Sequence, residues 1–391
     1  MTGRHVVLTI LAATFSISPA SAQEGVELFG YFEPQLSAAD LNGKVTQLAS
    51  NKLRVDLATA LSERASFAGN YIYVAYQGWT EYHLTDYLPD HLVSALPPGS
   101  LDPYVLEFTN RNDLDNACLR IAFEGFDLSL GKLQISPGSG YAWNPTDLFN
   151  AKDMLDPTYE NPGHSAVQVD IPLATRGTAM LLYGPEENLE ASSTFGRIKL
   201  HAGPLDVSLA GGQRLVQLTD FSTGAASTER RRLLGGDFAG ELLGLGVWGE
   251  AAFNNMEVSD DYIEGLIGAD YTFDSGCYLL NEFYVNEQGA TDKRDYDVNR
   301  WMRFLTAERK TVTRAQWYLY GSVPATDLLS VGGSIITSLS DGSFVVVPTM
   351  AYNIATNLDL TLFGNIYAGE EGAAYSPKLG QGGLLRLRYY F

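Results

Sequence analysis

Four acidic side chains lie in one long connection of the sequence, where their carboxylates could attract cations. They are Asp147, Asp153, Asp156 and Glu160, within the stretch 137–163, PGSGYAWNPTDLFNAKDMLDPTYENPG. This stretch is too long for a plain turn, and its aromatic and proline residues predict an ordered structure. If the flanking strands belong to a closed barrel, it could fold into the lumen as a constriction loop. The alternative is an ordered extracellular cap with no part in permeation.

The other charged candidates are sorted by sign along the chain. Basic residues come from the first half and the last segment, and acidic residues come from a later block. If the last strand pairs with the first, a basic wall would face an acidic wall, with a transverse field between them. The alternative is local pairing on adjacent strands, such as Arg54 with Asp56 or Arg120 with Glu124. The basic candidates are Arg54, Arg120, Lys132, Arg197, Lys199, Arg214, Arg386 and Arg388, and the acidic ones are Asp237, Glu250, Glu264, Asp270 and Glu282.

Residues that could act in catalysis or bind a metal are scattered. The sequence has no G-x-S-x-G motif, and its histidines lack metal-ligand spacing. His164 and Ser165 are adjacent, but neighbouring residues of a strand point to opposite faces and cannot act as a pair. Cys118 and Cys277 are expected at opposite ends of their strands, too far apart for a disulfide. We therefore predict no enzyme activity, no metal site and no cofactor.

These residues are positioned by segments of about ten residues, the length of a tilted membrane-spanning strand. Short links rich in Gly, Pro, Asn and Asp alternate with long links at 77–115, 137–163, 214–229, 287–313 and 368–379. This alternation predicts an all-β fold, a transmembrane antiparallel β-barrel of about 18 strands (16 is the alternative), with short periplasmic turns and long extracellular loops. The predicted strands are 26–37, 46–59, 64–76, 116–124, 127–136, 164–172, 176–184, 194–201, 204–213, 230–241, 244–254, 261–273, 276–286, 314–323, 327–338, 343–353, 356–367 and 380–391.

Apolar and polar side chains alternate along most segments, as expected when one face meets lipid and the other a wet lumen. The segment 127–136 changes phase at Gly131. A glycine bulge at that residue would restore the register and leave Lys132 and Gln134 facing inward.

The long link 287–313 contains a helical pattern, because Val298, Trp301, Met302 and Leu305 fall on one face of a helix. We expect this helix to pack over the barrel rim; a partner-binding helix is the alternative.

The last twelve residues alternate strictly and end the chain on an aromatic residue. Leu385, Leu387, Tyr389 and Phe391 share one face. This segment resembles the closing strand of Gram-negative outer-membrane β-barrels. The resemblance implies that Tyr389 and Phe391 form the signal read by the barrel-assembly machinery.

The amino terminus has the pattern of a cleavable export signal. Arg4 precedes a short apolar run at 6–15, and Ala20-Ser21-Ala22 fits a cleavage site. The apolar run is too short to span a bilayer as a helix. We predict a signal peptide at 1–22 and an outer-membrane barrel at 23–391.

The composition agrees with a barrel and limits the partners. Charged residues make up only 18% of the chain, and mean hydropathy is −0.06, as expected of strands that are apolar outside and polar inside. The net charge of −20 argues against nucleic-acid partners and leaves cation passage plausible. Arg230, Arg231 and Arg232 are expected at the outer rim, where they could bind lipopolysaccharide phosphates.

Two groups of residues carry a resemblance to a family. Gly131, Lys132 and Gln134 are followed, after a glycine-rich turn, by Trp143, Asn144, Pro145 and Asp147. This arrangement resembles Gram-negative porin-like barrels of the alginate-export type. The resemblance implies that the loop bearing the Trp-Asn-Pro-x-Asp motif lies in or near the pore.

The sequence therefore predicts an outer-membrane channel for small hydrophilic or ionic solutes, biased towards cations. The alternative is a barrel that serves as sheath or scaffold for a partner, such as a polymer exporter or an electron-carrying periplasmic protein. The expected partners are outer-membrane lipid, lipopolysaccharide, the assembly machinery and small solutes. Porins are often trimers, so a homo-oligomer remains open.

Overall fold

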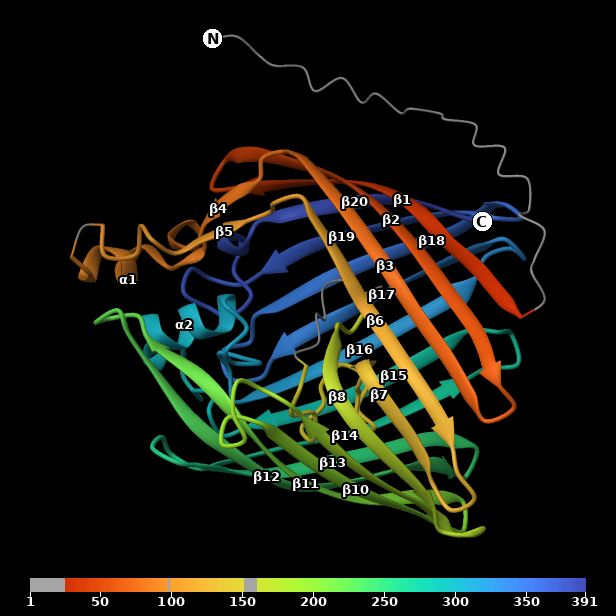
Figure 1. The fold of residues 1–391 in the computed structure, drawn as a ribbon. Helices are drawn as coiled ribbons and strands as arrows, with labels where there is room; N and C mark the ends of the chain where they lie inside the picture. Colours follow the sequence, from red (N-terminus) through yellow and green to blue (C-terminus); the bar gives the residue numbers. More distant parts are fainter. Residues whose placement is uncertain (1–24, 98, 151–159) are drawn as a thin grey trace.

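The computed structural model describes residues 25–97, 99–150 and 160–391. Within them, 18 antiparallel strands form one closed barrel (Figure 1). Each strand pairs with the next along the chain, and β20 (Gln381–Tyr390) closes the barrel on β1 (Val26–Leu41). The remaining barrel strands are β2 (Lys44–Ser62), β3 (Ala65–Gly78), β6 (Arg111–Ala122), β7 (Asp127–Gln134), β8 (Gly163–Pro172), β9 (Gly177–Gly184), β10 (Ser193–Ala202), β11 (Leu205–Asp220), β12 (Ala225–Leu242), β13 (Leu245–Met256), β14 (Tyr262–Thr272), β15 (Tyr278–Asn286), β16 (Ala315–Pro324), β17 (Leu329–Ser338), β18 (Phe344–Ala355) and β19 (Leu358–Ala368).

The prediction of an 18-stranded transmembrane-type barrel is confirmed, and each predicted strand overlaps one observed strand. Closure pairs the backbone N–H and C=O groups along every strand edge, which a barrel in lipid requires. Apolar side chains are exposed on the outer face, such as Leu209 (70% exposed) and Ile267 (59%). The predicted signal peptide, 1–22, lies outside the described residues.

Two strand pairs are longer than predicted. The strands β11 and β12 have 16 and 18 residues, so the link predicted at 214–229 is only the turn 221–224. The strands β1 and β2 likewise extend to the turn 42–43. Each strand of such a hairpin satisfies the backbone of the other, so pairing can continue past the length that crosses a bilayer.

The long connections gather at one end of the barrel, which we call the loop end; β1 begins and β20 ends at the opposite, turn end (Figure 1). The connection 79–110 contains β4 (Glu81–His83), η1 (Leu84–Tyr87), α1 (Asp90–Ala95) and β5 (Val105–Glu107). The connection between β15 and β16 contains η2 (Lys293–Asp295) and α2 (Val298–Leu305). The connection between β19 and β20 contains η3 (Pro377–Leu379). None of the helices in the described ranges is long and apolar enough to cross a membrane.

The helix predicted within 287–313 is present as α2. Its first turn is capped by Asp297, whose side chain accepts a hydrogen bond from the backbone N–H of Arg300 at 2.8 Å. Trp301 (1% exposed) and Met302 (0%) are buried. They belong to a hydrophobic cluster with inward side chains of β15 to β19, so the helix packs within the loop end.

The bulge predicted at Gly131 is absent, and this prediction was wrong. The pairings of β7 with β6 and with β8 run through Gly131 without a register shift. Leu133 (6% exposed) points inward and packs against apolar residues of the following loop. Alternation therefore places Lys132 on the outer face, beside Ser165. Gly131 has a different role: its φ is 127°, and a Cβ there would lie 2.0 Å from the carbonyl oxygen of Ala117.

Candidate functional site inside the barrel

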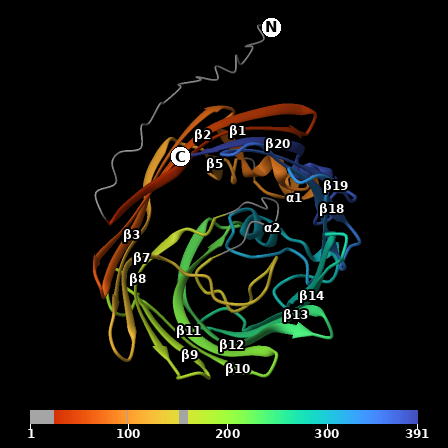
Figure 2. The ribbon, with the colours of Figure 1, turned by 90° about the vertical axis from the view of Figure 1, so that its right-hand side faces the viewer.

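The connection between β7 and β8, residues 135–162, turns into the barrel, and we call it the inner loop. Figure 2 looks along the barrel, and the yellow segment that follows β7 crosses the space inside the ring of strands. The described parts of the loop are 135–150 and 160–162, and residues 142–149 are all buried. The first described part of the loop is therefore packed against the inner wall.

Glu250 of β13 holds the first part of the inner loop. This residue is 4% exposed. Its carboxylate accepts hydrogen bonds from the backbone N–H groups of Ser139 (2.8 Å), Gly140 (3.0 Å) and Thr146 (2.5 Å). The Thr146 hydroxyl donates a further bond of 2.7 Å. One side chain thus fixes both ends of an eight-residue stretch, 139–146.

Glu282 of β15 holds the residues in between. It is completely buried. Its carboxylate accepts hydrogen bonds from the backbone N–H groups of Tyr141 (2.7 Å), Ala142 (3.0 Å) and Trp143 (3.0 Å). The indole N–H of Trp248 donates a fourth bond of 2.6 Å from β13. Three successive amides converging on one anion form a nest-like site, with the anion supplied by the barrel wall.

Glu250 and Glu282 are held in the same way, each by four hydrogen-bond donors. Every one of these bonds comes from an N–H or O–H group, and a carboxyl oxygen accepts it. Within the described ranges, neither carboxylate forms an ion pair with a cation. The wall beneath the inner loop therefore carries two acidic side chains without a cationic partner among the described residues.

Glu264 of β14 also lies on this wall, but its charge is neutralised. It is 1% exposed and pairs with Lys310 (3.0 Å) and Arg231 (3.3 Å). Lys310 also donates to the carbonyl oxygen of Asn144 at 2.7 Å, which ties the inner loop to the connection that carries α2. Arg231 therefore faces the lumen, whereas we had expected it at the outer rim.

Trp143 and Phe149, both in the first described part of the inner loop, pack against the barrel wall. Trp143 stacks on Tyr284 of β15, with ring centroids 4.8 Å apart and planes 4° from parallel. Further along, Phe149 packs edge-on against Phe195 of β10. Arg214 of β11 donates to the carbonyl oxygen of Phe149 at 3.1 Å. The charge of Arg214 is thus directed at the loop backbone.

Asn144 and Asp147 of the motif shape the loop itself. The Asn144 amide donates to the carbonyl oxygen of Pro137 at 3.1 Å. Asp147 is 2% exposed and accepts the backbone N–H groups of Phe149 (2.8 Å) and Asn150 (3.0 Å). This is the turn geometry that aspartate commonly supports, and it uses the charge that we had expected to face the lumen.

Glu160, in the second described part of the loop, contacts the opposite side of the barrel. Its carboxylate pairs with Lys52 (2.9 Å), Arg54 (3.2 Å) and Arg388 (3.7 Å) and accepts the Tyr31 hydroxyl at 3.0 Å. Burial by itself raises the pKa of Glu160, but the charge of Lys52 and the surrounding hydrogen bonds outweigh it, so the pKa lies below the usual range. The inner loop is thereby attached to both walls.

The basic residues expected to meet at the barrel seam are neighbours in space, but acids lie among them. Arg388 and Arg386 of β20 pair with Glu33 of β1 at 2.5 and 3.6 Å. Arg54 of β2 pairs with Asp56 at 2.8 Å. Local pairing, which was the alternative to a transverse field, therefore accounts for most of the charge at the seam.

Two further basic candidates pair with acids nearby. Arg197 of β10 binds Asp237 of β12 at 2.8 Å across β11. Lys199 binds Asp206 at 2.8 Å near the turn end.

The remaining candidates are less constrained. Asp270 is half-buried on the inward face of β14 and accepts the Tyr278 hydroxyl at 2.7 Å. Arg120 is exposed on β6, and no ion pair joins it to another described residue. Asp153 and Asp156 lie outside the described residues.

Sequence reasoning missed the partners that organise the loop. The sequence pattern does not single out the wall partners Lys52 and Trp248, and it predicts Glu282 as a lumen charge. Glu33 falls on the polar face of its strand, so its inward orientation was readable from alternation. Its pairing with Arg388 depends on the register across the seam, which a single strand does not reveal.

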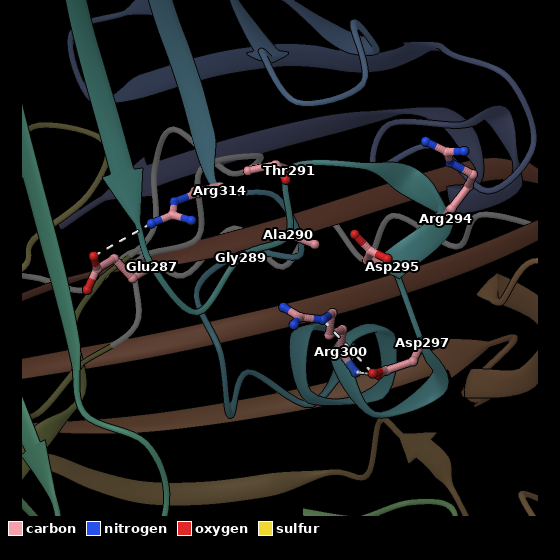
Figure 3. Close-up of a pocket in the computed structure, with 9 residues that line it drawn as sticks. All are labelled: Glu287, Gly289, Ala290, Thr291, Arg294, Asp295, Asp297, Arg300 and Arg314. Carbon is pink, nitrogen blue, oxygen red and sulfur yellow. Dashed lines mark hydrogen bonds and ion pairs between the residues drawn. The ribbon is translucent and has the colours of Figure 1, made fainter.

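A polar hollow of about 560 Å³ lies at the loop end, apart from the inner loop (Figure 3). Arg314 pairs loosely with Glu287 on one side, at 3.6 Å, and Arg300 lies beside Asp297 on the other, at 4.0 Å. Charges of both signs line this hollow, so it does not favour one sign of ion.

The closed antiparallel barrel is a fold that solved outer-membrane porins share. Among solved structures, the chain is similar to OccAB4 of Acinetobacter baumannii, at a TM-score of 0.57 and 10% identity over 95% of this chain and 99% of that one. It is also similar to Salmonella typhi OmpF (TM-score 0.47, 10% identity, 94% and 97% covered) and Vibrio cholerae OmpT (0.47, 12%, 94% and 99%). At these identities the likeness concerns the fold. No protein-family model and no curated protein matches the sequence.

Proposed function

We propose that this chain is an outer-membrane channel for the diffusion of small hydrophilic or ionic solutes, with a preference for cations. The observation that carries the proposal is that three acidic side chains of the wall that holds the inner loop, Glu250, Glu282 and the more accessible Asp270, form no ion pair with any described residue. In this proposal the inner loop narrows the lumen, so permeating ions pass close to these charges.

Proximity decides which charges act on a permeating ion. At physiological salt, the influence of an exposed charge decays over about 8 Å, so the net charge of −20 acts mainly through the acids nearest the path. Buried charges are screened less than exposed ones. Asp270, on the same wall towards the turn end, adds a third carboxylate without an ion pair in the described ranges.

The basic side of the barrel opposes this effect only weakly. Its cations are largely compensated, because three acids lie among four basic residues and leave one excess positive charge. The set comprises Lys52, Arg54, Arg386 and Arg388 with Glu33, Asp56 and Glu160. The balance across the lumen therefore favours cations.

The test is the zero-current potential of purified barrels in planar bilayers under a KCl gradient. Asp270→Asn should lower the permeability ratio of K⁺ to Cl⁻ relative to the unmodified chain, because it removes an accessible carboxylate of the lumen wall. The matched control is Asp274→Asn, which makes the same change in an exposed turn four residues away. Equal shifts in both variants would contradict the proposed position of the charge. No conductance in any preparation, together with a co-purifying partner, would favour the scaffold function instead.

We also propose that Tyr389 and Phe391 present the assembly signal. The backbone N–H and carbonyl of Phe391 pair with Gly30 at 3.1 Å each, so the last residue belongs to the closing seam. Tyr389 is 48% exposed and Phe391 36%. Both rings are therefore accessible to the assembly machinery.

A further inference from the structure

A cluster of tyrosines lies beside the acidic wall of the lumen, and the hydrogen bonds of the inner loop do not account for it. Tyr141 of the inner loop lies over Tyr318 and Tyr320 of β16, with ring centroids 5.8 and 6.5 Å apart. Tyr278 of β15 lies 6.1 Å from Tyr320. We call Tyr141, Tyr278, Tyr318 and Tyr320 the tyrosine cluster.

Three rings of the cluster remain accessible. Tyr141 is 48% exposed, and Tyr278 and Tyr320 are half-buried, whereas Tyr318 is 6% exposed and forms the floor. Exposed aromatic rings normally face lipid on the outside of a barrel. Here they face inward, from a loop inside the barrel and from inward positions of two neighbouring strands.

The surroundings of the cluster are negative. Asp270 accepts the Tyr278 hydroxyl at 2.7 Å, and Glu282 accepts the backbone N–H of Tyr141 at 2.7 Å. Burial and the nearby Tyr320 and Glu282 together raise the pKa of Tyr141. No lysine or arginine of the described ranges forms an ion pair with Asp270 or Glu282.

From this arrangement we infer that the tyrosine cluster is a binding site for organic cations, in particular those with a methylated ammonium group. Aromatic faces attract such cations through their quadrupole, and carboxylates supply the matching charge. A bare metal ion fits less well, because hard cations require several oxygen ligands, and the oxygens of Glu282 are already occupied by four N–H donors. The inference rests on the proposed channel function, since it names a solute class for the same lumen.

The inner loop gives this site its shape. Glu282 accepts the backbone N–H of Tyr141 itself and Glu250 accepts that of Ser139, so the backbone that carries the Tyr141 ring is fixed to the wall. Asp270 lies level with the cluster, because its register partner on β15, Leu280, is itself paired with Tyr320. A solute that passes the inner loop would therefore meet the rings and the Asp270 side chain together.

The test is titration calorimetry of choline into the full folded barrel in detergent, with 3,3-dimethylbutanol as the neutral analogue of the same shape. Choline should bind and the neutral analogue should not. Tyr320→Leu and Asp270→Asn should each weaken choline binding on the order of tenfold. Tyr352→Leu is the matched control, because Tyr352 is 38% exposed on the outer face of β18.

Each outcome decides between binding at the cluster and no such site. Absence of choline binding, equal binding of the neutral analogue, or unchanged binding in both cluster variants overturns the inference. Heat-modifiable migration on gels shows in advance that each variant is folded. If choline does not bind while K⁺ preference persists, only the inference fails. If choline binds but the barrel does not conduct, the channel function fails and the binding site stands.

Discussion

Replacing Glu282 by glutamine should loosen the inner loop while leaving the barrel closed. The carboxylate accepts four N–H groups, three of them from consecutive loop residues. The single carbonyl oxygen of glutamine has two acceptor positions, and its NH₂ group would face the remaining donors. At least two hydrogen bonds are lost, each worth about 1.5–3 kcal/mol when the acceptor is charged. The attachment of the loop should therefore weaken by roughly 3–6 kcal/mol.

The effect can be read directly from amide hydrogen exchange of the loop. The backbone N–H groups of Tyr141, Ala142 and Trp143 exchange only when they leave Glu282. A loss of this size should make their exchange about 10²- to 10⁴-fold faster, since every 1.4 kcal/mol is a factor of ten. Amides of the strand pairs should exchange as before, because their ladders do not involve Glu282 side-chain atoms.

Glu241→Gln is the matched control, since it makes the same chemical change at an exposed position of β12 near the turn end. It should leave the exchange of all three amides unchanged. The reasoning would be refuted by slow exchange of these amides in the Glu282 variant, or by equal acceleration in both variants.

Three further predictions concern other parts of the same site. The pKa of Glu160 is lowered in the folded protein. The ion pairs that attach Glu160 to the barrel wall are therefore fully formed above its ordinary pKa of 4.5, and they are lost as the pH falls through its lower pKa in the folded protein. Single-channel conductance should therefore change below about pH 4, and Glu160→Gln should show the acid-state conductance already at pH 7. Gly131→Ala should lower the free energy of unfolding of the barrel by about 1–3 kcal/mol or more, because Gly131 has a positive φ and a Cβ there would clash with the carbonyl of Ala117. An unchanged urea midpoint would contradict this. The control is Gly125→Ala, because a Cβ at Gly125 would meet nothing within 4 Å. Arg214→Ala should speed exchange near residue 149 without altering the exchange of 141–143, because it contacts only the carbonyl end of the first described part.

The barrel could be predicted from sequence because its determinants are local. Period-two alternation and turn-forming links depend on residues that are close in the chain, and both gave the observed strand number. The errors arose where non-local contacts decided the outcome. Leu133 faces inward because residues from the inner loop cover it, and an isolated strand pattern assigns such a leucine to lipid.

The roles of the charged residues were harder to predict for the same reason. Alternation places Glu250 and Glu282 on the inward face, but it gives no sign that backbone amides of residues 139–146 would occupy both carboxylates. Asp147 looked like a lumen charge and instead forms a turn within the loop. Backbone donors are not visible in a sequence as charged partners, so a long loop that folds inward changes the roles of the residues it covers.

The central claim is that the lumen favours cations, and the most direct measurement is the zero-current potential of the unmodified barrel across a tenfold KCl gradient in a planar bilayer. Cation preference predicts a steady conductance with the dilute side positive, because K⁺ crosses more readily than Cl⁻. A potential of the opposite sign, or one near zero, would contradict the account of the acidic wall.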